Sequence, residues 1–155
     1  MVARAGGGGA GGDLTAPSGH RTVPHTADLR IEAWGPTRER CLVEAVRCLV
    51  ASFADATGVH PLRTDRLDLP SGPDADVLVA LLDEVVYRLD AEGELVLDTE
   101  ITQTSDGGFT AWLTVGDAGQ AVPVGAVPKA VSLHDLRFGA DPRTGVWSCA
   151  VTIDV

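Results

Sequence analysis

Apolar and polar residues alternate over residues 28–34, and this is the first regular pattern in the chain. A period of two is typical of a strand with one buried face. The apolar positions are Leu29, Ile31 and Ala33. Gly35 and Pro36 follow directly and break the pattern, so we predict a strand that ends there.

The pattern then changes to a helical period. Apolar residues recur at helical spacing over residues 42–53, and Thr37 is placed to cap the helix. We expect this helix to fade over residues 55–58. Residues 63–70 are mostly polar and end at Pro70, which predicts a short edge strand.

A second amphipathic helix is predicted over residues 78–89, with Gly93 at its expected end. Ser71 and Asp74 match the spacing of a capping box before it. The exposed side of this helix is strongly acidic, which is typical of a solvated face and compatible with a docking surface.

Strand patterns dominate the rest of the chain. Residues 94–104 and 109–115 read as a hairpin around a turn at residues 105–108, and residues 116–127 as a loop. Two more strands are predicted at residues 129–138 and 146–155. The element order predicts an α+β fold, in which two amphipathic helices pack on a mainly antiparallel sheet.

Composition sets the domain organisation. The 155 residues are 45% hydrophobic, enough for one buried core. Residues 1–20 are rich in glycine and are expected to form a disordered tail, which leaves residues 21–155 as a single domain. No apolar run suggests a membrane span or a signal peptide.

Charge and cysteine content narrow the function classes. Twelve basic against 22 acidic residues give a net charge of −10, so direct binding to nucleic acid is not expected. Metal ions or a basic protein surface are better partners for such a chain, and solubility alone also accounts for the charge. Three cysteines without a CxxC pair favour a reduced, cytoplasmic setting, in which they are small buried hydrophobes.

Two carboxylates stand at strand ends. Asp28 begins the first predicted strand and Asp154 ends the last, so antiparallel pairing of these strands would bring them together. The α-carboxylate of Val155 would add a third donor if it is the native terminus. Oxygen donors without thiolates suit a hard divalent cation such as Mg²⁺, Mn²⁺ or Ca²⁺. Spacing alone also allows two unrelated surface aspartates.

Four short segments resemble one known family. They are the HTAD motif at residues 25–28, the helix end at residues 87–93, the PKAVSLH segment at residues 128–134 and the VTIDV terminus at residues 151–155. In this order and register the chain resembles the archease family over residues 23–155. Leu133 departs from the pattern, since an aromatic residue is expected before His134, and the glycine-rich tail is additional.

The resemblance implies an accessory factor rather than an enzyme. Archeases assist the RtcB-type RNA ligase of tRNA splicing and RNA repair, by promoting its metal- and GTP-dependent guanylylation and its multiple turnover. The resemblance assigns a cation site to Asp28, Asp154 and Val155. Lys129, His25 and His134 lie in the matching motifs and are candidates for contact with a phosphate or with the partner. No organic cofactor is implied.

Two alternatives stay open beside this interpretation. A metal-dependent adaptor or chaperone-like module for other RNA-processing enzymes would fit the same residues. A hydrolase built from Ser132, His134 and Asp135 is disfavoured, because strand alternation would point Asp135 away from His134. No nucleophile elbow occurs either.

Overall fold

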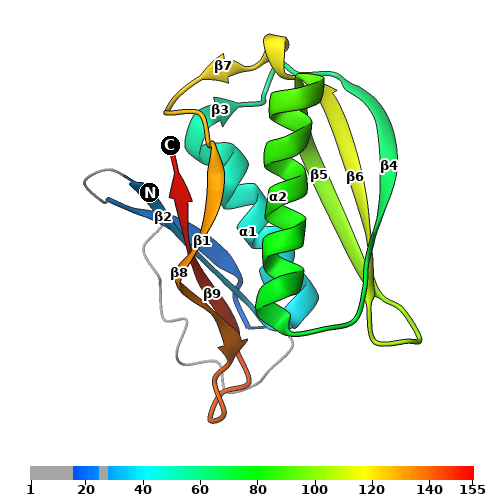
Figure 1. Ribbon diagram of the computed structural model, residues 1–155, viewed down its shortest axis with the longest axis vertical. Helices are drawn as coiled ribbons and strands as arrows, with labels where there is room; N and C mark the ends of the chain where they lie inside the picture. Colours follow the sequence, from blue (N-terminus) through cyan, green and yellow to red (C-terminus); the bar gives the residue numbers. More distant parts are fainter. Residues whose placement is uncertain (1–15, 25–27) are drawn as a thin grey trace.

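The structure is a computed structural model that describes residues 16–24 and 28–155. Two helices lie between two antiparallel sheets, one of strand order β1-β2-β9-β8 and one of order β4-β6-β5 (Figure 1). The predicted α+β class is confirmed, although the strands are divided between the two faces of the helical layer. The helices are α1 (Arg38–Phe53) and α2 (Asp74–Glu92). The strands are β1 (Gly19–Pro24), β2 (Asp28–Gly35), β3 (Ala54–Asp55), β4 (Pro61–Leu69), β5 (Glu94–Gln103), β6 (Phe109–Asp117), β7 (Val122–Pro123), β8 (Ala130–Ala140) and β9 (Trp147–Asp154).

The four-stranded sheet contains both ends of the predicted domain. β2 pairs with β9, and Ile31 lies opposite Val151 in the register. Both side chains are completely buried, as the period of two predicts for the face that meets the helices. β1 was not predicted; it pairs with β2 along its whole length, so Gly19 and His20 belong to the domain. Residues 1–15 lie outside the described residues, and the expected tail stays a prediction for them.

A buried carboxylate explains how β1 is held against α1. Glu44 lies on α1 with 5% of its surface exposed, and its Oε1 is 2.7 Å from Nδ1 of His20 on β1. Arg40 and Arg47 each lie 3.1 Å from its Oε2. Burial by itself raises the pKa of Glu44, but His20 and the two guanidinium groups outweigh it, so the pKa is lowered. The charge on Glu44 is therefore retained inside the domain.

The predicted start of α1 is confirmed, because the Thr37 side chain accepts a hydrogen bond from the N–H of Arg40 at 3.1 Å.

The cysteines also behave as predicted: Cys41, Cys48 and Cys149 are free and buried in the core. Burial raises the pKa of the Cys48 thiol to about 12. The Cys48 thiol is therefore protonated near neutral pH, and all three cysteines pack as apolar groups in the core.

The predicted capping box of α2 is wrong. Pro73 is the N-cap residue, and no side chain makes a capping hydrogen bond there. Asp74 is instead the first helical residue, and its Oδ1 lies 2.7 Å from Nη1 of Arg38 on the other helix. The predicted end of α2 is confirmed, since Gly93 adopts a left-handed conformation with φ of 64°.

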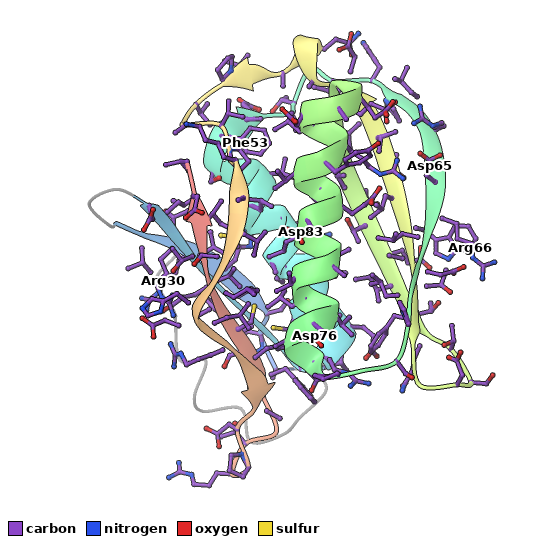
Figure 2. All side chains as sticks on the ribbon, viewed as in Figure 1. Arg30, Phe53, Asp65, Arg66, Asp76 and Asp83 are labelled. Atoms are coloured by element: carbon purple, nitrogen blue, oxygen red, sulfur yellow. The ribbon has the colours of Figure 1, made fainter. Side chains whose placement is uncertain are left out.

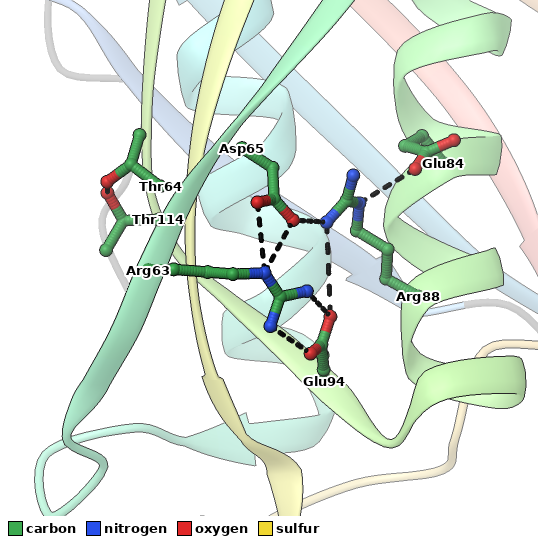
Figure 3. A network of polar contacts seen from close by, with 7 residues as sticks. All are labelled: Arg63, Thr64, Asp65, Glu84, Arg88, Glu94 and Thr114. Carbon is green, nitrogen blue, oxygen red and sulfur yellow. Dashed lines mark hydrogen bonds and ion pairs between the residues drawn. The ribbon is translucent and has the colours of Figure 1, made fainter.

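A polar network fastens α2 to the three-stranded sheet (Figure 3). Arg88, which is only 13% exposed, donates to Asp65 at 2.5 Å and to Glu84 at 2.7 Å. Arg63 binds Asp65 at 3.0 Å and Glu94 at 2.7 Å. Arg88 and then Arg63 hold the pKa of Asp65 below its usual value. The predicted polar edge strand is confirmed as β4, and these charged residues make it a specific part of the helix–sheet contact.

The predicted loop at residues 116–127 is wrong in part. It contains a short 3₁₀ turn (Ala118–Gln120) and the strand β7, which pairs with β3 after the end of α1. A strand of two residues carries no readable period, so the sequence pattern could not reveal it.

Within residues 16–24 and 28–155, no helix combines the length and apolarity needed to cross a membrane.

Candidate functional site

Asp28 and Asp154 are direct cross-strand neighbours. They occupy paired positions in the β2–β9 register, so the predicted antiparallel pairing is confirmed. Residues directly opposite one another point to the same face of a sheet. The alternation that buries Leu29 and Ile153 toward the helices therefore places both carboxylates on the outer face. Asp154 is exposed, and a partner could reach it from solvent.

Lys129 and Val155 lie beside this pair. The main-chain N–H of Lys129 donates to the carbonyl oxygen of Asp154 at 2.8 Å. Ala130 then pairs with Asp154 from β8, so Asp154 has a strand on either side. Val155 follows β9 directly and is half-buried. These contacts fix the backbone of Asp154 and leave its carboxylate at the end of the sheet.

The donor chemistry of this site fits a hard divalent cation. The two side chains present four oxygen atoms and no sulfur, as Mg²⁺, Mn²⁺ and Ca²⁺ prefer. Among the residues that the structure describes, no group of three His, Cys, Asp or Glu side chains could hold a metal ion. The third donor that the resemblance implies is the α-carboxylate of Val155, and His25, the candidate partner contact, lies outside the described residues. Cation binding at Asp28, Asp154 and Val155 stays a prediction.

A cleft of about 630 Å³ is lined by Asp28, Arg30 and Thr152 and by the irregular part of β8, with His134 and Asp135. Arg30 projects into this region from the sheet face away from the helices (Figure 2). Its Nη1 donates to Thr152 Oγ1 at 2.8 Å, and its Nη2 donates to the carbonyl of Asp135 at 2.9 Å. Arg30 thus connects the strand of Asp28 with the irregular part of β8. The sequence did not identify Arg30 as a site residue.

The argument from alternation against a Ser132–His134–Asp135 hydrolase was wrong. The β8–β9 register shifts between Ser132 and Arg137, and Asp135 has a φ of 55°. This irregularity turns Asp135 toward His134, and its Oδ2 lies 3.2 Å from Nε2 of the imidazole. His134 is 87% exposed, however, and Ser132 Oγ accepts a hydrogen bond from the His134 main chain at 3.2 Å. A solvated pair of this kind lacks the buried aspartate that orients a catalytic histidine.

Comparison with known proteins identifies relatives over nearly the whole chain. The model described as "Archease protein family (MTH1598/TM1083)" matches residues 20–155. A Mycobacterium tuberculosis H37Rv protein described as "Probable protein archease" is 51% identical over 138 residues, covering 89% of this chain and 75% of that protein. "Protein archease" from Methanopyrus kandleri is 26% identical over 139 residues, covering 86% of this chain and 96% of that protein.

Two solved structures share the fold. The solution structure of Methanobacterium thermoautotrophicum protein 1598 has a TM-score of 0.69 at 20% identity, and covers 88% of this chain and 99% of that chain. The crystal structure of a Thermotoga maritima protein, described as "an archease, possible chaperone", has a TM-score of 0.63 at 19% identity, and covers 87% of this chain and 96% of that chain. The family model spans the described domain, and the mycobacterial relative is 51% identical over most of the chain. The chain belongs to the archease family.

Proposed function

We propose that this protein activates an RtcB-type RNA ligase of tRNA splicing or RNA repair. It would promote the metal- and GTP-dependent guanylylation of the ligase and allow multiple turnovers, without catalysing a reaction of its own. The observation that carries this proposal is the pairing of Asp28 with Asp154 at the exposed end of the sheet. These are the positions to which the family resemblance assigns a divalent-cation site. A cytoplasmic setting is part of the proposal.

In this proposal the residues of the chain would hold a cation and orient it toward the ligase. The β2–β9 and β8–β9 pairings hold the main chain of Asp28 and Asp154 in place, so the backbone of the site needs little reorganisation when a cation binds. A bound divalent cation would supply positive charge to neutralise GTP phosphates during nucleotidyl transfer. Lys129 is exposed next to Asp154, where its ammonium group would contact a phosphate or a carboxylate of the ligase.

A guanylylation assay of the cognate ligase tests the proposal. This protein is added at substoichiometric amounts in Mg²⁺ or Mn²⁺, and the guanylylated ligase is quantified over time. We expect Asp28→Asn and Asp154→Asn each to lower stimulation at least tenfold. Asp90→Asn, an exposed aspartate on α2, is the matched control and should stimulate fully. Full stimulation by the Asp28→Asn, Asp154→Asn double variant would refute the role of the pair, and no stimulation by the unaltered protein would refute the ligase function.

A second candidate follows from the Thermotoga neighbour, which is described as a possible chaperone. Here the protein would be a metal-dependent adaptor or chaperone-like module for other RNA-processing or RNA-modifying enzymes. Affinity capture from cells, followed by mass spectrometry, separates the two candidates. Recovery of the ligase supports activation, whereas recovery of a different RNA-modifying enzyme, lost in the double variant, supports the adaptor.

A further inference from the structure

A second cleft, on the other side of the molecule's helical layer, runs along the free edge of β5. It has a volume of about 410 Å³ and is mostly apolar. Four consecutive residues of β5, Val96 to Thr99, contribute to its wall. Successive residues of a strand point to opposite faces, so a cleft that contacts four in a row lies beside the strand. β5 is the terminal strand of the order β4-β6-β5, which makes this side a free edge among the described strands.

The main chain of β5 borders this cleft. The β5–β6 register shifts between Val96 and Asp98, so a bulge lies in the middle of the cleft wall, and next to it the N–H of Thr99 donates to Oδ1 of Asp98 at 2.9 Å. An edge strand carries main-chain N–H and C=O groups that a further strand can pair with. The Thr99 hydroxyl is buried in this wall and has no hydrogen-bond partner among the described residues. An added peptide backbone would bring hydrogen-bonding groups to this edge.

The opposite wall provides apolar surface for side chains. Val46, Val50 and Ala51 contribute from α1, and Val124 contributes from the segment after β7. Val124 is 58% exposed, and its N–H donates to the carbonyl of Phe53 at 3.0 Å, which fixes it at the mouth of the cleft. This wall would accept one or two aliphatic side chains of an extended peptide.

The charges at the rim select the occupant. Asp55 and Asp98 are exposed, and neither has an ion pair among the described residues. Arg47, the cation of the lining, already lies 3.1 Å from Glu44. The rim is therefore negative, on a chain with a net charge of −10.

We propose that this cleft binds an extended segment of a partner protein, alternating basic and aliphatic residues, which adds to β5 as a new edge strand. Main-chain hydrogen bonds to β5 give affinity, aliphatic side chains fill the cleft, and basic side chains face Asp55 and Asp98. The proposal is independent of the cation site, which lies on the four-stranded sheet.

The probe is a synthetic heptapeptide that alternates valine with lysine or arginine. Its binding is measured by fluorescence polarisation, and hydrogen exchange reports on the β5 amides. We expect slower exchange at residues 96–99 on binding and at least tenfold weaker binding of a charge-reversed glutamate peptide. Two further peptides are N-methylated at every second amide, so that each loses the hydrogen-bond donors on one side of the strand. One of these two peptides should no longer bind. Equal affinity for both charge patterns, or unchanged exchange at β5, would overturn the proposal.

Two variants and a control locate the site. Ala51→Trp fills the cleft from an exposed helix position and should weaken binding about tenfold, whereas Ala91→Trp, at an exposed position on α2, should not. Asp98→Lys should reverse the charge preference. Equal binding by the Ala51→Trp and Ala91→Trp variants would overturn the proposal. Two other results would overturn it. If sedimentation shows a dimer that Ala51→Trp dissociates, the cleft belongs to a second copy of the chain. If the β5 amides are protected in the free chain and lose this protection when residues 1–15 are deleted, the cleft belongs to the chain's own N-terminal segment.

Discussion

Neutralising one carboxylate of the Asp28–Asp154 pair should stabilise the fold without divalent cations and remove its stabilisation by them. The two aspartates are directly opposite in the β2–β9 register and share the outer face of the sheet. Like charges at such positions repel each other. Asp154→Asn removes the repulsion and also removes one of the carboxylates that a cation would use.

The geometry sets the size of both effects. Opposite residues of an antiparallel pair place their Cβ atoms about 5 Å apart, and we take this distance as the separation of the two charges. Coulomb's law then gives about 0.8 kcal/mol in water and about 3 kcal/mol at an effective dielectric constant of 20. Because Asp154 is exposed, we expect a value near 1 kcal/mol at low salt that disappears in 1 M salt. A cation at about ten times its dissociation constant adds about 1.4 kcal/mol of stability to the unaltered chain.

Thermal unfolding followed by circular dichroism measures both effects, and no ligase activity is needed. In chelator, Asp154→Asn should melt about 3 °C above the unaltered chain, since 1 kcal/mol shifts the midpoint of a domain of this size by about 2–4 °C. Titration of Mg²⁺, Mn²⁺ or Ca²⁺ should raise the midpoint of the unaltered chain but not that of Asp154→Asn. Asp90→Asn makes the same charge change away from the pair and should keep the cation response.

The reasoning fails if Asp154→Asn and the unaltered chain show the same cation-dependent midpoint in all three metals. It also fails if Asp90→Asn loses the response equally, because the effect would then reflect net charge rather than the paired carboxylates.

Four further predictions concern the stability of the fold. Glu44→Gln should cost about 2 kcal/mol at pH 7. Because the folded-state pKa of Glu44 is lowered from 4.5, its stabilisation is present above 4.5 and is lost as the pH falls through the folded-state pKa. Urea unfolding should therefore show a cost that shrinks as the pH falls below 4.5, and a constant cost would contradict the prediction. Arg88→Met leaves Asp65 without a main partner and should cost about 2–3 kcal/mol in the same assay, whereas no loss would show that the network contributes nothing. Gly93→Ala forces a side chain into the left-handed region and should cost about 1 kcal/mol; a stabilising effect would contradict the left-handed conformation of Gly93. Thr99→Val removes a buried hydroxyl that has no hydrogen-bond partner among the described residues, and should be neutral or stabilising by about 1 kcal/mol. A destabilising effect would contradict the unpartnered state of this hydroxyl.

The sequence predicted most elements because their periods are local. The alternation over residues 28–34 and the helical spacing over residues 42–53 reflect which side chains must be buried, and the structure buries Ile31 and Leu49 completely. Thr37 and Gly93 were found at helix ends because capping depends on neighbouring residues. The Ser71 capping box failed, since Pro73 occupies the cap and Asp74 is bound by a distant arginine.

The candidate cation site could be predicted in part for the same reason. Asp28 and Asp154 were identified as strand ends from their own segments, but their pairing depends on which strands are neighbours. Arg30 was missed because its partners, Thr152 and the Asp135 carbonyl, are more than a hundred residues away. His25 lies outside the described residues, so its role stays a prediction.

The sequence by itself determined the elements, their buried faces and the position of two carboxylates at strand ends. Only the tertiary structure decided that the longer strands form two sheets around the helices, that β1 joins β2, and that a bulge turns Asp135 toward His134. A residue's burial preference is a property of its local pattern, whereas strand order, bulges and clefts depend on segments that meet only after folding. The free edge of β5 beside an apolar cleft is therefore visible only in the folded chain.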